Sequence, residues 1–136
     1  MSSRLPLFFL SAAAACLVCG VALGIGMGMA HNFQLAPVHA HTNLVGWTSL
    51  ALMGLSFRVW PELAEGRLAV AQFVISAGSA IAFPPGIYLA VMHEAPGLAI
   101  VAGMVWFLGA LLFLGRVLRL AFAGAPRRVP AMMPAE

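Results

Sequence analysis

The sequence predicts an all-α integral membrane protein, a bundle of four transmembrane helices with both termini on the cytoplasmic side. Of its 136 residues, 62% are hydrophobic and only 8% are charged, whereas a soluble domain has about 25% charged residues. A helix needs about 20 apolar residues to cross the hydrocarbon core of a bilayer. Four such helices with short turns use nearly the whole chain, which leaves no room for a second, soluble domain.

The first expected helix covers about residues 5–30 and consists of apolar and small residues. Its start, with Arg4 before an apolar run and an alanine tract, is similar to a secretory signal peptide. The apolar run is, however, about twice as long as the hydrophobic region of such a peptide. We therefore expect this segment to be retained as a membrane-spanning helix.

Three further helices follow, each bounded by proline, glycine or charged residues. They are expected at about residues 38–60, 68–92 and 96–122. The four helices together are expected to form one transmembrane domain, residues 1–123, and residues 124–136 are expected as a cytoplasmic tail.

The arginines predict how the chain crosses the membrane. They lie at the N-terminus, between the second and third helices, and at the end of the fourth helix and in the tail. These residues are Arg4, Arg58, Arg67, Arg116, Arg119, Arg127 and Arg128. Cytoplasmic loops carry an excess of basic residues, so we expect these segments on the cytoplasmic side of a bacterial inner membrane. The arginines are not interleaved with aromatic residues as in a single-strand binding surface, and no nucleic-acid partner is expected.

All four histidines fall on the opposite, periplasmic side in this topology. They are His31, His39, His41 and His93. Polar groups at membrane depth are costly and usually functional, and neutral imidazole is a common ligand of transition metals and of haem iron. One such histidine is adequately explained as an interfacial side chain, but four on one side favour the binding of a cofactor or metal ion.

His39 and His41 are two residues apart, which is about 200° around a helix, so they do not serve the same side of one planar cofactor. The face below His39 is small and weakly polar, with Thr42, Gly46, Ser49, Met53 and Ser56. The face below His41 is apolar and suited to lie against a porphyrin, with Val45, Thr48, Leu52 and Leu55. At most one of the two histidines is therefore expected as a first ligand.

His93 is a further candidate at the end of the third helix. Glu94 follows it and either accepts a ring N–H, as carboxylates near metal ligands do, or is a solvated loop charge. Pro84 and Pro85 remove two backbone donors and predict a kink in this helix, which moves the His93 end relative to the second helix.

A row of small residues, Gly20, Gly24 and Gly28, lies on one face of the first helix and lets another helix approach closely. Two interpretations stay open, packing within the bundle and contact with a second protomer. Cys16 and Cys19 of the same helix are expected as packing residues, because a disulfide between positions three apart on a helix is strained.

The motif His41-Thr42-Asn43-Leu44 stands at the start of a helix that ends near a proline and leads to a short basic loop. It resembles the second helix of subunit I in the haem-copper oxidase superfamily, particularly its nitric oxide reductase and cbb3-type branches. In that family the histidine of this motif is an axial ligand of the low-spin haem b, so the resemblance implies this role for His41. A complete subunit I has many more helices and further metal ligands, so an independent terminal oxidase is not implied.

The helices of this family form pseudo-equivalent groups, and the chain resembles one such group. The resemblance therefore implies a homo-oligomer that recreates ligand pairs between protomers. It gives two routes to a haem with two axial ligands, either His41 with His93 of the same chain or His41 with a histidine of a neighbour.

The function predicted from the sequence is haem b binding near the periplasmic face, for electron transfer or diatomic-gas binding. His41 is the first expected ligand, and His93 and His39 follow. One alternative is a periplasmic-side copper or zinc protein that uses all four histidines. Another is a cofactor-free accessory subunit of a respiratory complex, and respiratory-chain proteins are the partners that these functions imply.

Overall fold

The computed structural model describes residues 4–122, and this part of the chain is helical, without a β-strand. The elements are α1 (Leu5–Ala30), α2 (Ala36–His41), the π-helix η2 (Thr42–Ser49), α3 (Leu50–Val59), the 3-10 helix η3 (Pro61–Ala64), α4 (Gly66–His93) and α5 (Gly97–Phe122). The expected all-helical class is confirmed. The expected tail, with Arg127 and Arg128, lies outside the described residues.

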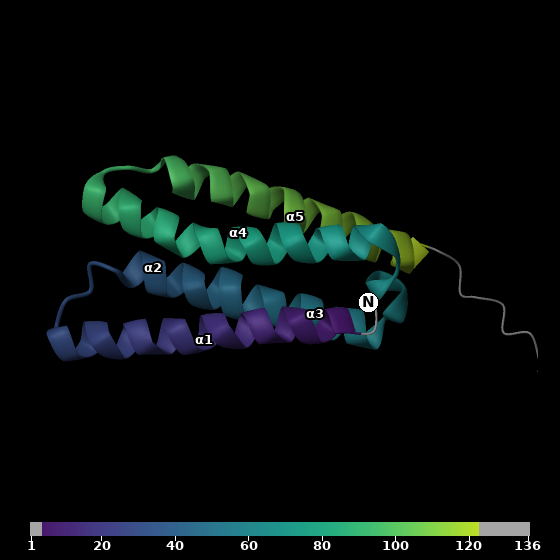
Figure 1. Cartoon of the computed structure of the whole chain (residues 1–136), viewed down its shortest axis with the longest axis horizontal. Helices are drawn as coiled ribbons and strands as arrows, with labels where there is room; N and C mark the ends of the chain where they lie inside the picture. The colour runs from purple at the N-terminus through teal and green to yellow at the C-terminus, as the bar shows by residue number, and fades with distance from the viewer. Residues whose placement is uncertain (1–3, 123–136) are drawn as a thin grey trace, which may run out of the picture.

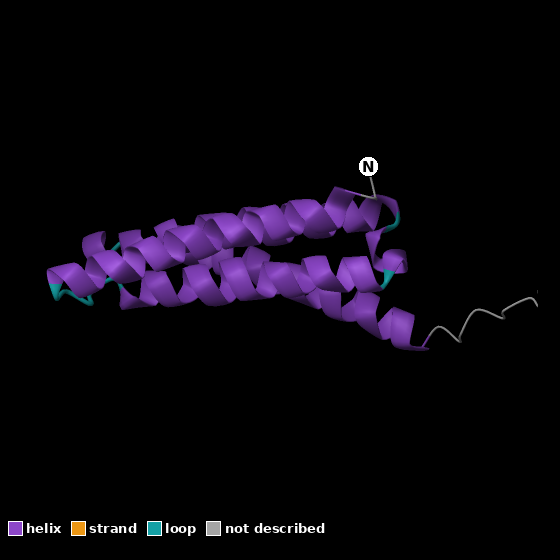
Figure 2. Cartoon of the chain, turned by 90° about the horizontal axis from the view of Figure 1, so that it is seen from below, coloured by secondary structure: helices purple, strands orange, loops and turns teal. Residues whose placement is uncertain are grey.

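The helices run back and forth between two ends of an elongated bundle (Figure 1). α1 leads away from the N-terminus, and α2, η2 and α3 follow one another without a break as a single rod that returns. η3 turns the chain, and α4 and α5 form a second hairpin beside the first. The start of α1 and the end of α5 therefore lie at the same end, and the loops are confined to the two ends (Figure 2).

The two ends differ in the ionisable side chains that they carry. The arginines of the described chain lie near the start of α1, at the end of α3, at the start of α4 and in the last turns of α5. They are Arg4, Arg58, Arg67, Arg116 and Arg119. This end is termed the arginine end, and the opposite end, to which all four histidines belong, is termed the histidine end.

Three helices, α1, α4 and α5, are long and apolar enough to span a membrane. Large apolar side chains also cover the outside of the bundle, and Val18, Ile25, Val74 and Leu108 are each more than half exposed. Such a continuous apolar exterior is stable against lipid and not against water. The chain is accordingly a multi-pass membrane protein.

Small residues bring α1 close to the rod formed by α2, η2 and α3. A Cβ atom on Gly20 would collide with the side-chain amide of Asn43, and one on Gly24 would lie 2.8 Å from Cε1 of His39. On the other side of the contact, a Cβ atom on Gly46 would lie 2.7 Å from the sulfur of Cys16. In lipid, helix association depends on such close packing, because the hydrophobic effect does not drive it.

The glycine row of α1 is therefore mainly an internal packing surface. Of the two interpretations, packing within the bundle accounts for Gly20 and Gly24. The side chains of Asn43 and His39 in the same chain already occupy this face. At Gly28, no described atom lies within 4 Å of an added Cβ.

α5 packs against α4 through a backbone contact and a buried polar cluster. A Cβ atom on Gly86 would lie 2.6 Å from the backbone nitrogen of Ala99, so the two helices touch there. Closer to the arginine end, Gln72 is fully buried and its Nε2 donates to the carbonyl of Gly109 at 2.9 Å and to Oγ of Ser76 at 2.8 Å. Hydrogen bonds of this kind hold helices together where water is excluded.

Gly86→Ala is expected to destabilise the α4–α5 hairpin by about 1–3 kcal/mol, the usual cost of overpacking. The added methyl group meets backbone atoms of Ala99, which move only if α5 moves. Gly78→Ala on the same helix is the control, because no described atom lies within 4 Å of its added Cβ and alanine favours a helix over glycine by up to about 1 kcal/mol. The midpoint of thermal unfolding in detergent should fall for Gly86→Ala and stay or rise for Gly78→Ala. Equal shifts would contradict the backbone contact.

Aromatic rings fill the core near the arginine end. Phe9 of α1 lies edge-to-face with Phe57 of α3 and with Phe73 of α4, with ring centroids 5.1 Å apart in both pairs. The guanidinium of Arg116 in α5 lies over the Phe57 ring, 5.0 Å from its centroid. These contacts are favourable in their own right, and they connect α1, α3, α4 and α5 at this end.

Candidate cofactor site at the histidine end

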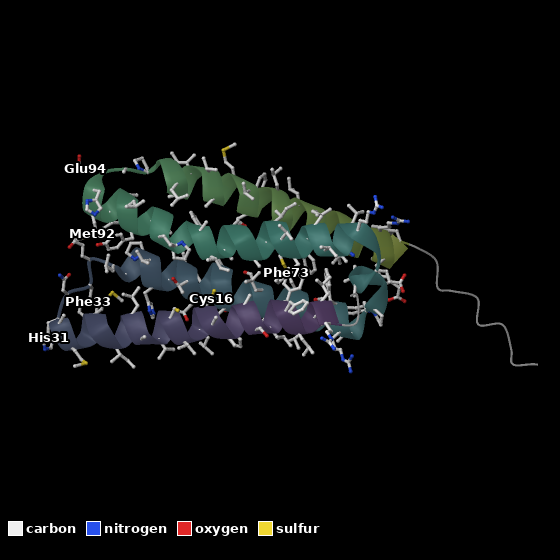
Figure 3. All side chains as sticks on the ribbon, viewed as in Figure 1. Cys16, His31, Phe33, Phe73, Met92 and Glu94 are labelled. Atoms are coloured by element: carbon white, nitrogen blue, oxygen red, sulfur yellow. The ribbon has the colours of Figure 1, made fainter. Side chains whose placement is uncertain are left out.

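The fold brings all four histidines to one end of the bundle. His31 follows the last residue of α1 in a left-handed conformation, with φ 50°. His39 and His41 lie in α2, and His93 is the last residue of α4. Figure 3 shows His31 and Glu94, the neighbour of His93, at this end, far from the N-terminus.

His39 is a contact between α1 and α2. Its Nδ1 lies 2.8 Å from the carbonyl oxygen of Gly20, and because a carbonyl only accepts, Nδ1 carries the proton and donates. The ring lies against Gly24. The Asn43 side chain donates to the His39 carbonyl at 2.9 Å and packs on Gly20. The geometry thus explains His39 fully as a packing and hydrogen-bonding residue between two helices.

His41 points in another direction, toward α4. Its Nδ1 donates to the carbonyl of Pro37 at 2.8 Å. The ring is half-buried and lies edge-to-face with Phe83, at a centroid distance of 5.1 Å. With the proton on Nδ1, the lone pair is on Nε2, and no side-chain hydrogen bond within residues 4–122 engages that atom. His41 is therefore held in the tautomer that a metal ligand needs.

The backbone widens into the π-helix η2 directly after His41. The hydroxyl of Ser49 donates to the carbonyl of Leu44, five residues back, at 2.7 Å, in keeping with the register of a π-helix. Thr42 donates to the carbonyl of Val38 at 2.8 Å. Segments of this kind are rare and occur frequently at functional sites, and no feature of the hydrophobic pattern indicated one here.

The two faces below the histidines differ in exposure. Below His39, Thr42, Gly46 and Met53 are buried within the bundle. Below His41, Val45 is half-buried, and three further residues of the expected porphyrin wall are exposed. They are Thr48, Leu52 and Leu55. The wall below His41 is thus open on the outside of the bundle, so this chain alone does not enclose a planar cofactor there.

His41 and His93 are not brought together as a ligand pair within one chain. His41 contacts Phe83, and His93 lies ten residues farther along α4, which is about 15 Å at 1.5 Å per residue. Two axial nitrogens on one iron lie only about 4 Å apart, since metal–imidazole bonds are about 2 Å long. α4 continues as a helix across Pro84 and Pro85. The two prolines therefore do not fold the His93 end of α4 back toward His41.

His93 and His31 lie at the exposed surface of the histidine end. The His93 ring packs against Tyr88, with centroids 5.9 Å apart. Glu94 adopts a left-handed conformation, with φ 53°, and ends α4 as its C-cap residue. Within residues 4–122 no group of three or more His, Cys, Asp or Glu side chains is placed to hold a metal ion.

The residues present fit one axial ligand to haem b and not a complete pair. His41 meets the donor requirement, because its Nδ1 is fixed by a carbonyl and its Nε2 carries the lone pair. Phe83 packs against this ring but was not among the residues predicted from the sequence. Its position directly before Pro84 and Pro85 is the only sequence signal that could have pointed to it.

Comparison with protein-family models, curated proteins and solved structures finds no significant match to this chain.

Proposed function

We propose that this chain is a membrane-embedded b-type haem-binding protein, in which His41 is an axial ligand near the periplasmic face. The observation that carries the proposal is the hydrogen bond from Nδ1 of His41 to the Pro37 carbonyl. It fixes the tautomer and the ring plane, as hydrogen-bonded partners of metal-bound histidines do. Bound haem b supplies an iron that changes oxidation state or binds a diatomic gas.

The chain's own contribution is to bind, orient and partly shield that group. Phe83 packs against the His41 ring and limits its rotation. Val45, Leu52 and Leu55 present an apolar surface below the histidine, which suits a porphyrin face at membrane depth. Because this surface is exposed in the single chain, we propose that a second copy covers it and that one of its histidines would help to hold the haem. The working form is then a homo-oligomer that transfers electrons or binds gas without independent turnover.

The visible spectrum of the full-length protein, purified in detergent, tests this function. A reduced-minus-oxidised spectrum with the split band of a six-coordinate haem b supports the proposal. Copper or zinc by elemental analysis, without haem, supports the metal-binding alternative and rejects haem. The absence of haem, copper and zinc from protein purified without added cofactors, together with failure to take up added haem, identifies a structural subunit.

The proposed topology has four membrane crossings, with the arginine end in the cytoplasm. The rod of α2, η2 and α3 is the additional crossing, because it runs beside α1 from one end of the bundle to the other (Figure 1). The segregation of the described arginines to one end supports this orientation.

A reporter fused after Gln34, in the loop between α1 and α2, is expected to behave as periplasmic. A fusion after Glu62, in η3 at the arginine end, is the matched control and should behave as cytoplasmic. An alkaline phosphatase and green fluorescent protein pair measures both sites, since each reporter is active on one side only. Cytoplasmic behaviour of the Gln34 fusion would reverse the placement of the histidines.

A further inference from the structure

A pocket of about 590 Å³ opens at the arginine end, on the opposite side of the molecule from His41. It lies between η3, the start of α4 and the last turns of α5. The charged residues in its wall are Glu62, Glu65, Arg67, Arg116 and Arg119. The proposed haem function uses none of these side chains, so the pocket needs its own explanation.

Arg116 supplies a fixed positive charge in the pocket wall. Its Nη2 donates to the backbone carbonyl of Leu63 in η3, and its guanidinium lies over the Phe57 ring. Its Nη1 is buried and has no hydrogen-bond partner among the described residues. The side chain is thus held in place by a carbonyl and a ring, neither of which carries a negative charge. Nη1 itself is out of reach of a ligand, but no described carboxylate pairs with the guanidinium, and its charge therefore attracts an anion through space.

The start of α4 adds a second source of positive potential. α4 begins at Gly66, whose φ is 75°, and Glu65 at the preceding position makes no side-chain hydrogen bond to the helix. The first turn of α4 contains no acidic residue. The first backbone N–H groups of a helix lack partners within the helix and carry a partial positive charge. Gly66 and Arg67 both line the pocket, so these donors lie at its edge.

Two carboxylates, Glu62 and Glu65, also line the pocket and oppose an anion. Three arginines and the uncapped helix start outweigh them, and the guanidinium groups are suited to bidentate contact with tetrahedral oxyanions. In the proposed topology this end lies at the cytoplasmic headgroup level, where basic pockets between helices bind phosphate-bearing lipids. We infer that this pocket binds a phosphate group of net negative charge, contacted by Arg67 and Arg119 from the rim and attracted by the fixed charge of Arg116.

Native mass spectrometry of the full-length protein in detergent tests the inference. Micelles are doped with phosphatidylglycerol or with phosphatidylcholine, which share the phosphate but differ in net charge. We expect preferential retention of phosphatidylglycerol. The double variant Arg67→Gln, Arg119→Gln should retain it about 25-fold less, at about fivefold for each basic residue near an anionic group. Arg58→Gln is the matched control, because Arg58 is exposed at the same end and lies outside the pocket wall.

Competition with inorganic phosphate distinguishes the two sources of the bound phosphate group, a lipid headgroup and a free phosphate ion. Displacement of phosphatidylglycerol by millimolar phosphate indicates a site for a free phosphate, and resistance indicates a lipid headgroup. Glu62→Gln gives a test that does not depend on removing an arginine, and it should strengthen retention by up to about fivefold because a repelling charge is lost. Equal retention of both lipids, or an equal loss in Arg58→Gln, would overturn the inference.

Discussion

His41→Ala is expected to remove most of the haem b from the purified protein while leaving it in the membrane. The methyl group provides no iron ligand, and the hydrogen bond to the Pro37 carbonyl disappears with the ring. Membrane insertion depends on the apolar helices and not on one imidazole. Haem content per protein, from the reduced-minus-oxidised absorbance, should fall by at least about tenfold, since loss of a ligand costs more than the 10- to 100-fold in affinity typical for a supporting residue.

His39→Ala and His93→Ala are the controls for this result. His39→Ala should retain most of the haem but unfold more readily, because it removes the hydrogen bond to Gly20 between α1 and α2. Interhelical hydrogen bonds in membranes contribute about 0.6 kcal/mol on average. His93→Ala should have little effect, because its ring lies at the exposed end of α4. If His39→Ala stays folded and loses as much haem as His41→Ala, the assignment of His41 as the haem ligand is wrong and His39 takes that role.

The fold class was predictable because it follows from composition and from long apolar runs. Helices of this length are fixed by the need to cross lipid with every backbone group satisfied. α1 begins and ends where the apolar run does, at Leu5 and Ala30. The π-helix after His41 was not predictable, because the hydrophobic pattern does not distinguish it from an α-helix. The structure places its Gly46 close to Cys16 of α1. Those residues lie far apart in the sequence, and local periodicity carries no signal for their contact.

The candidate site was predictable only in part, and for a similar reason. The helical period places His39 and His41 on different sides of their helix, and the structure has them facing α1 and α4 respectively. The partner of each ring depends on how helices align along the bundle. That alignment puts Phe83 opposite His41 and leaves His93 about 15 Å farther along α4. Sequence spacing alone does not contain this offset.

Gly24→Leu is expected to disrupt the packing of α1 against α2 within a single chain. Its Cβ atom alone would lie 2.8 Å from the His39 ring, and the rest of the side chain has no space there. Overpacking of this kind costs about 1–3 kcal/mol. The hydrogen bond from His39 to Gly20 is lost if the ring is displaced. The unfolding midpoint in detergent should therefore fall, and haem content should fall with it, because α2 also carries His41.

Gly28→Leu separates this internal effect from contact between protomers. Gly28 lies on the same helix, one turn farther on, and no described atom lies within 4 Å of its added Cβ. The substitution also raises helix propensity by up to about 1 kcal/mol, so the unfolding midpoint should stay or rise. Native mass spectrometry then measures the fraction of protein that remains oligomeric in detergent. This fraction should fall in Gly28→Leu only if this part of α1 contacts a second chain. If Gly24→Leu instead unfolds like the parent and merely dissociates the oligomer, α1 faces a neighbouring protomer, and the contact between His39 and Gly24 belongs to two chains.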